Sequence, residues 1–219
     1  MAEIVKVNRD DPEPEVIARA AEMIRKGEVV AIPTDTFYGL AANPFDAAAV
    51  ERIFAIKGRG KHMPLLLLID SVAMARELAA ELPPGFERLT ERFWPGPLTI
   101  VVKASPRVPG EVTGETGRIG LRLPRAAVAT AIVKQTRVPI IGTSANRTGE
   151  KECATAQEVE AQIGAAVPLI LDGGASGATR TSTVIDVRPD SWKVLREGAI
   201  EVREIEKVIG TRGYFGGLL

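Results

Sequence analysis

Short apolar runs alternate along this chain with segments whose apolar residues recur at helical spacing, and this alternation limits the fold more than any other feature. The first helix is expected to follow the candidate caps Asp10 and Asp11, with Pro12 and Pro14 in its first turn. Its apolar repeat stops at Gly27, where a helix of this kind ends. A buried strand of residues 29–32 is expected to follow directly.

The later elements continue the same alternation. Further helices are expected at residues 46–57, 71–80, 86–93, 126–135, 155–163 and 201–209, the first of them capped by Asp46. Further strands are expected at residues 65–69, 98–103, 119–123, 139–143, 169–171, 183–187 and 193–196. A Pro- and Gly-rich segment joins strands 98–103 and 119–123, and a short turn joins the last two strands. Because neither connection resembles a crossover helix, the sequence predicts an α/β fold with a mixed sheet.

The composition is typical of a globular protein, and the formal net charge is zero. With 219 residues and 45% hydrophobic content, it is expected to form a single domain over residues 1–219, with a frayed tail at 211–219. The 28 Lys and Arg residues balance the 28 Asp and Glu residues, so affinity for nucleic acid would require a local patch. Such a patch is expected around Lys57, Arg59, Lys61 and His62. The longest apolar run, residues 64–69, is too short to span a bilayer, and we expect a cytoplasmic protein.

Cysteine and histidine are too scarce for several kinds of chemistry. Cys153 is the single cysteine and His62 the single histidine, which excludes an internal disulfide and a zinc site built from these ligands. Cys153 is therefore interpreted as incidental, and the compartment as reducing. No metal-binding residue is predicted, and any Mg²⁺ is expected to travel with bound phosphates.

Three short strings combine polar or cationic side chains with Gly or Pro close to an apolar run. They are PTDTFYGL (residues 33–40), KGRGK (57–61) and TSAN (143–146). Loops beyond strand ends are where α/β domains bind ligands, and alternating cations can converge on a polyphosphate. The plainer interpretations are a capped loop, a solvated charge run and a turn. The chain contains no Walker loop, no G-x-G-x-x-G after a strand and no nucleophile elbow, so ATP binding would use none of these signatures.

The order of several motifs resembles the YrdC family. PTDTFYGL and KGR are followed by WPGPLT (94–99), IGLRLP (119–124), TSAN, STVID (182–186) and REGAI (196–200), and the match runs from about residue 27 to residue 210. The resemblance, to the single-domain members, implies an open twisted α/β sheet with flanking helices around a concave basic cleft. It also implies an L-threonylcarbamoyladenylate synthase. This enzyme converts L-threonine, bicarbonate and ATP into threonylcarbamoyl-AMP and pyrophosphate, for N6-threonylcarbamoyladenosine at tRNA position 37 and a downstream threonylcarbamoyl transferase complex.

The resemblance also implies roles for individual residues. Residues at positions where the family binds L-threonine are Thr36, Arg122, Ser144 and Ser182. Residues at positions where it binds ATP are Lys57, Arg59, Arg118, Asn146, Thr155 and Arg196, and Lys57 and Arg59 are the expected catalytic cations. Thr155 is the weaker match, and Arg118 is either an extra phosphate ligand or a surface charge. The reaction requires positioning and charge neutralisation more than a protein nucleophile.

Alternatives remain for single residues and for the whole chain. Arg122 alternates with Leu121 and Leu123, so it is either a solvent-facing arginine or a clamp on the threonine carboxylate. Trp94 is expected to pack in the core, and Gly60 and Leu68 stand where many family members have Pro and His. Two other functions fit the same motifs: an RNA-binding module that binds tRNA or other RNA weakly in the same cleft, and a paralogue acting on another carbamoyl or adenylyl substrate.

Overall fold

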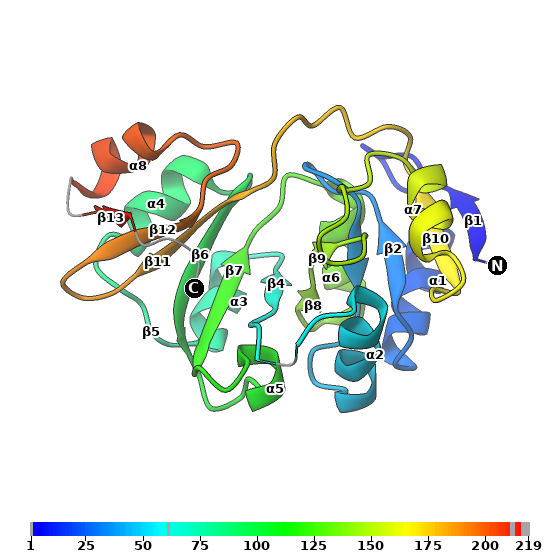
Figure 1. Cartoon of the computed structure of the whole chain (residues 1–219), viewed down its shortest axis with the longest axis horizontal. Coiled ribbons are helices and arrows are strands. Elements are labelled where there is room, and N and C mark those ends of the chain that lie inside the picture. The colour runs from blue at the N-terminus through cyan, green and yellow to red at the C-terminus, as the bar shows by residue number, and fades with distance from the viewer. Residues whose placement is uncertain (1, 61, 211–212, 216–219) are drawn as a thin grey trace.

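The computed structural model describes residues 2–60, 62–210 and 213–215, and it contains the alternating helices and strands that the sequence predicts (Figure 1). The single strand expected at residues 139–143 is the exception, because this segment forms two short strands of different sheets. The helices are α1 (Pro14–Arg25), α2 (Ala47–Lys57), α3 (Val72–Leu78), α4 (Phe86–Phe93), α5 (Gly110–Thr113), α6 (Ala127–Thr136), α7 (Ala156–Ile163) and α8 (Val202–Ile209). The strands are β1 (Glu3–Lys6), β2 (Val30–Ile32), β3 (Gly39–Ala41), β4 (Leu66–Leu68), β5 (Ala79–Glu81), β6 (Leu98–Ala104), β7 (Arg118–Arg122), β8 (Ile140–Ile141), β9 (Thr143–Ser144), β10 (Leu169–Asp172), β11 (Thr183–Val187), β12 (Trp192–Arg196) and β13 (Gly213–Phe215). Among the described residues, no helix is long and apolar enough to cross a membrane.

The strands form two mixed sheets rather than one. The first has the order β1-β10-β2-β3-β9, with parallel pairing from β1 to β2 and antiparallel pairing from β2 to β9. The second has the order β13-β12-β11-β6-β7-β4-β8, and β5 pairs with β6 at its side. Parallel and antiparallel pairs alternate along the second sheet. The α/β class, the mixed pairing and the flanking helices are thus confirmed, and the strands are divided between two sheets.

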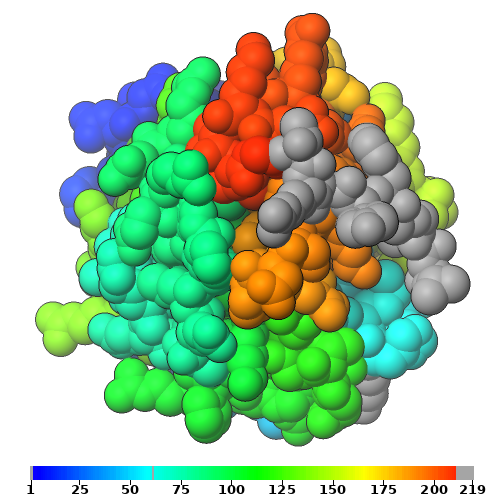
Figure 2. Space-filling view, turned by 90° about the vertical axis from the view of Figure 1, so that its left-hand side faces the viewer, coloured from blue at the N-terminus to red at the C-terminus, as the bar shows by residue number. Residues whose placement is uncertain are grey.

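Each sheet carries its own helices, and the two sheets face each other across the middle of the molecule (Figure 1). Buried residues of α1 and α6 pack with those of β2 and β10 on one side of the first sheet, and α2 and α7 pack with its other side. Helices α3, α4 and α8 contribute to the core beside the second sheet. Figure 2 looks onto this second part, where α8 (red), α3 and α4 (blue-green) and the β11–β12 hairpin (orange) form the surface.

The N-termini of α1 and α2 show how the local sequence determines where a helix begins. Asp46 caps α2 as predicted, since its side chain accepts hydrogen bonds from the backbone N–H groups of Ala48 and Ala49. The prediction of Asp10 and Asp11 as caps of α1 is wrong. The N-cap is Glu13, whose side chain accepts from the N–H of Asn8, and Pro14 occupies the first helical position. Pro suits that position because its missing N–H has no helical partner there.

Trp94 and the C-terminal strand β13 both lie against neighbouring segments of the chain. Trp94 is in the core as predicted: its ring meets Phe86 edge-on with centroids 5.7 Å apart, and its Nε1 donates to the carbonyl of Leu98 at 2.7 Å. Within the tail that the sequence predicts to be frayed, Gly213–Phe215 form β13, which pairs in parallel with β12. Residues 211, 212 and 216–219 lie outside the described residues.

Candidate functional site

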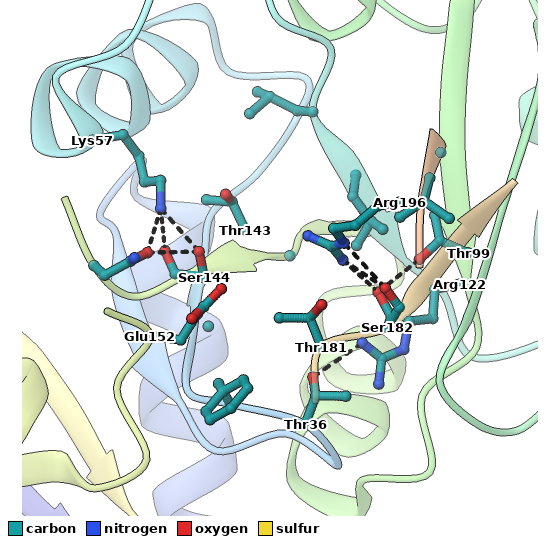
Figure 3. A pocket seen from close by; sticks show the side chains of 18 of the residues that line it. Thr36, Lys57, Thr99, Arg122, Thr143, Ser144, Glu152, Thr181, Ser182 and Arg196 are labelled. Atoms are coloured by element: carbon teal, nitrogen blue, oxygen red, sulfur yellow. Dashed lines mark hydrogen bonds between the residues drawn. The ribbon is translucent and has the colours of Figure 1, made fainter. Parts of the chain in front are cut away.

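A cavity of about 610 Å³ lies between the two sheets and is lined by most of the sequence motifs (Figure 3). On the side of the first sheet, its walls come from the PTDTFYGL loop, the end of α2 and the loop that follows β9. On the other side, they come from β4, β6, β7, β11 and β12. The cavity therefore draws on segments from residue 34 to residue 196.

Lys57 binds the TSAN segment to the end of α2. Its Nζ donates to the Ser144 carbonyl at 2.7 Å, to the Ser144 Oγ at 3.1 Å and to the Asn146 Oδ1 at 2.7 Å. The Ser144 hydroxyl also donates to Asn146 Oδ1, at 2.6 Å, and the Asn146 amide donates to the carbonyl of Glu150. An ammonium has three donors, so Lys57 has a protein acceptor for each one. Burial, followed by the charge of Arg59, lowers the pKa of Lys57 to about 8.

Arg59 has the opposite character, because its guanidinium has no acceptor for much of its donor capacity. The group lies over the ring of Phe54, with Cζ 5.4 Å from the ring centroid, and it lines the cavity. Its Nε and Nη2 are buried and have no hydrogen-bond partner among the described residues. Burial lowers the pKa of Arg59. Unpaired guanidinium donors beside a cavity are suited to a phosphate.

The rest of the expected cationic patch is only partly described. His62 is exposed, and its ring lies against Gly60. Lys61 lies outside the described residues. The cavity itself is lined by Lys57, Arg59, Arg122 and Arg196, and also by the carboxylates Glu150 and Glu152.

Arg122 is buried at the end of β7, so its interpretation as a solvent-facing arginine is wrong. Its Nε donates to the carbonyl of Gly96 at 3.1 Å, its Nη1 to the Thr36 hydroxyl at 3.2 Å and its Nη2 to Asp35 Oδ1 at 2.5 Å. A guanidinium has five N–H groups, and these contacts leave one on Nη1 and one on Nη2. A residue of the second sheet is thereby joined to the PTDTFYGL loop of the first, and Figure 3 shows the Thr36 contact.

Ser182 and Arg196 form a third polar group, on the side of the second sheet. Arg196 donates to the Ser182 carbonyl from Nε at 3.1 Å and from Nη2 at 2.9 Å, and Nη2 also donates to the Ser182 Oγ at 2.9 Å. The Ser182 hydroxyl lies 3.2 Å from that of Thr99. Burial and the nearby charge of Arg122 lower the pKa of Arg196. Figure 3 shows this group facing the Lys57 group across the cavity.

Two of the predicted ATP residues do not line this cavity. Arg118, at the opposite end of β7 from Arg122, pairs with the buried carboxylate of Asp186 and donates to the carbonyls of Val101 and Val187. It is therefore not a free surface charge, and it does not line the cavity. Thr155 is the N-cap of α7, where it forms a capping box with Glu158. Its hydroxyl serves the helix start, which explains its presence without a ligand.

Other cavity residues were not singled out by the sequence. Thr99, the last residue of WPGPLT, and Thr181, which directly precedes STVID, contribute hydroxyls, so the motifs themselves were the available signal. Gly142 is required by close packing, since a Cβ there would lie 2.4 Å from the Cγ of Leu68. Leu68, one of the departures from the family pattern, lines the cavity beside it.

Cys153 does not line the cavity. Cys153 is fully buried in the core, and burial raises its pKa to about 11. The described residues contain no group of three or more His, Cys, Asp or Glu side chains that could hold a metal ion. The arrangement can thus bind anionic groups with its cations and orient a polar ligand with its hydroxyls and amide.

Comparison with known proteins gives a consistent result. Residues 22–198 match the Sua5/YciO/YrdC family, whose sequence profile is described as telomere recombination. A threonylcarbamoyl-AMP synthase of Pyrococcus abyssi is 41% identical over 191 residues, covering 87% of this chain and 56% of that protein. A putative threonylcarbamoyl-AMP synthase of Mycobacterium tuberculosis is 34% identical over 194 residues, covering 89% of each.

The same likeness holds in three dimensions. The crystal structure of P. abyssi Sua5 complexed with L-threonine aligns with a TM-score of 0.92 and 39% identity, over 97% of this chain and 63% of that one. The chain thus spans less than two thirds of the P. abyssi protein, and most of the M. tuberculosis relative.

Proposed function

Because this chain belongs to the Sua5/YciO/YrdC family, we propose that it is an L-threonylcarbamoyladenylate synthase, a nucleotidyltransferase. Its substrates are L-threonine, bicarbonate and ATP, and its products are threonylcarbamoyl-AMP and pyrophosphate. The relatives named as threonylcarbamoyl-AMP synthases, and the P. abyssi Sua5 structure with L-threonine, support this proposal.

One observation supports the proposal most strongly: a single cavity brings together hydroxyl, amide and cationic groups from motifs far apart in the sequence. Thr36, Lys57, Arg59, Arg122, Ser144, Asn146, Ser182 and Arg196 all line it. Its volume of about 610 Å³ is within the range of small-molecule sites. We assign Thr36, Arg122, Ser144 and Ser182 to L-threonine, and Lys57, Arg59, Asn146 and Arg196 to ATP.

The chemistry requires charge neutralisation at the phosphates. Threonine's amine and bicarbonate form an N-carboxy group with loss of water. One of its oxygens then attacks the α-phosphorus of ATP, the bond to the β-phosphate bridging oxygen breaks, and pyrophosphate leaves with that electron pair. Arg59 would neutralise the developing phosphate charge, because its Nε and Nη2 are unpaired. Lys57 would supply charge while holding Ser144 and Asn146 in place.

A divalent cation fits the cavity only together with the nucleotide. Glu150 and Glu152 are the carboxylates that line it, and they are too few to form a dedicated cage. Mg²⁺ bound with ATP would reduce the repulsion between its phosphates. We therefore propose that phosphate oxygens and water supply most of its ligands.

The wider context follows from the same activity. The adenylate would be used by a threonylcarbamoyl transferase complex to form N6-threonylcarbamoyladenosine at tRNA position 37. Since ATP and tRNA are cytoplasmic, we propose a cytoplasmic location. We propose that the cleft is net positive, because four cationic side chains line it and, among the residues described, only two carboxylates accompany them.

The experiment that tests this function is an omission assay. Pyrophosphate release from ATP is measured with all substrates, and then with L-threonine or bicarbonate left out in turn. The synthase predicts release that depends on both. Release that does not require threonine would indicate a paralogue with another substrate, and RNA binding with no release of pyrophosphate would indicate a binding module.

A further inference from the structure

Asp35 is a residue of the PTDTFYGL loop to which the proposed reaction assigns no role, although it contacts Arg122 directly. Its Oδ1 accepts from Arg122 Nη2 at 2.5 Å, and the side chains are 12% and 5% exposed. This is a buried ion pair between the loop after β2, in the first sheet, and the end of β7, in the second. Its position makes it a link between the two walls of the cavity.

The other contacts of Arg122 show what this link determines. The Gly96 carbonyl accepts a hydrogen bond from Nε, and the Thr36 hydroxyl accepts one from Nη1. With Asp35 on Nη2, each guanidinium nitrogen has one protein acceptor. The plane of the group is therefore fixed from three directions. The two remaining N–H groups, one on each Nη, are donors that a carboxylate in the cavity could use, since Arg122 lines it.

Asp35 is the only one of these three acceptors that carries a charge. Its other oxygen, Oδ2, is buried and has no hydrogen-bond partner among the described residues. A buried carboxylate oxygen without a partner is unfavourable, so the carboxylate is not placed there for local stability alone. Arg92 and Arg125 line a hollow beside Asp35, but they are exposed and donate no hydrogen bond to it in the described part of the chain.

We propose that Asp35 is a positioning residue that orients the Arg122 guanidinium for the carboxylate of the amino-acid substrate. This inference rests on the proposed function, since it takes L-threonine as that substrate. Asp35 acts through Arg122 and does not touch the substrate itself. Its influence should therefore appear in the affinity for threonine and not in that for ATP.

The test compares steady-state kinetics of three variants at this position. Asp35→Ala removes the acceptor and should raise the threonine KM about tenfold or more, with the ATP KM changing less than about twofold. Asp35→Glu keeps the charge but displaces it by one methylene, and should raise the threonine KM several-fold. Asp35→Asn keeps an oxygen acceptor for Nη2, so the threonine KM of this variant should lie within about threefold of that of the original chain.

The chain contains a matched control at the other end of β7, where Arg118 pairs with Asp186 of β11. Asp186 is the buried carboxylate that pairs with Arg118 at the other end of β7, away from the cavity. Asp186→Ala removes the buried carboxylate that pairs with Arg118 and also with Arg188, and it should lower the melting temperature while leaving the threonine KM within about twofold. Asp35→Glu provides the kinetic comparison if Asp35→Ala does not fold.

The outcomes separate this inference from the proposed function. An unchanged threonine KM in Asp35→Ala or Asp35→Glu, or an equal rise for ATP, would overturn the positioning role while the synthase activity stands. So would a similar rise in Asp186→Ala, because it would indicate general destabilisation. If the original chain releases no pyrophosphate in response to threonine, the proposed function fails, and this inference fails with it.

Discussion

Lys57 and Arg59 lie two residues apart and line the same cavity, yet the structure predicts different consequences when each is replaced by alanine. Lys57→Ala removes a donor from the Ser144 carbonyl, the Ser144 hydroxyl and Asn146 Oδ1. Arg59→Ala removes a side chain whose Nε and Nη2 have no partner in the described structure, and whose recorded contact is with the Phe54 ring. The first variant should lose stability and activity, and the second mainly activity.

The magnitudes follow from these contacts. Hydrogen bonds to a charged group contribute roughly 1.5–3 kcal/mol each, but relief of the buried ammonium's desolvation offsets much of their sum in Lys57→Ala. We expect a net loss of about 2 kcal/mol, which for a domain of this size lowers the melting temperature by about 4–8 °C. For Arg59→Ala, loss of a cation–π contact of about 0.5–1 kcal/mol is offset by relief of burial, so the melting temperature should change by less than about 2 °C.

Both variants should reduce pyrophosphate release by roughly two orders of magnitude or more, as expected when a charge partner worth about 3 kcal/mol is lost from the transition state. The assays are thermal unfolding of each purified variant and pyrophosphate release at saturating substrates. Near-normal release by both variants would remove these cations from the reaction. An equal loss of stability in Arg59→Ala would refute the division of roles between them.

Four other outcomes are expected. Arg122→Lys should raise the threonine KM about tenfold, equivalent to roughly 1.4 kcal/mol, because one ammonium cannot replace a planar guanidinium. The ATP KM should change much less. Steady-state kinetics measure both values, and an equal loss for the two substrates would contradict the prediction. Cys153→Ser should retain activity in the pyrophosphate assay. Thiol alkylation of the folded chain should be slow, because the thiol is buried and burial raises its pKa to about 11. Complete loss of pyrophosphate release in the serine variant would instead indicate thiol catalysis. Pyrophosphate release should decline as the pH rises through about 8, where Lys57 loses its proton, and Lys57→Arg should shift this decline to higher pH; identical pH profiles would exclude the role of Lys57's charge. Because the folded-state pKa of Lys57 is lower than its unfolded value of 10.5, the unfolded chain binds more protons between these values, and this group's contribution to stability should increase from about pH 8 to pH 10.5.

The longer elements could be predicted from the sequence because local information specifies them. The apolar repeat of α1 appears as the buried residues Ile17, Ala20, Ala21 and Ile24, and Asp46 caps α2 through its own neighbours. Strands β3 and β9 have only three and two residues; β3 begins at the end of the PTDTFYGL string and continues one residue beyond it, and β9 lies within TSAN. A pattern with a period of two cannot be recognised in so few residues. Their pairing depends on segments about 100 residues apart meeting in space.

The site shows the same limit in the two arginines of β7. Arg118 and Arg122 are four residues apart and share a face of the strand, so periodicity treats them alike. Their side chains are separated by about 13 Å along the strand, and this decides their environments. Arg122 meets the PTDTFYGL loop, whereas Arg118 meets Asp186 of β11. The strand order β11-β6-β7 brings Arg118 near Asp186. Arg122 finds Asp35 only because the two sheets meet, and Lys57 finds its acceptors only because α2 packs beside the TSAN segment.

The central claim, that this cavity forms a threonylcarbamoyl adenylate, is tested most directly by following the bicarbonate carbon into the product. The chain is incubated with ATP, Mg²⁺, L-threonine and ¹³C-labelled bicarbonate, and the nucleotide products are analysed by mass spectrometry. The account predicts threonylcarbamoyl-AMP carrying the ¹³C label, formed together with pyrophosphate. An unlabelled adenylate, or ATP hydrolysis without a threonine-containing product, would contradict it.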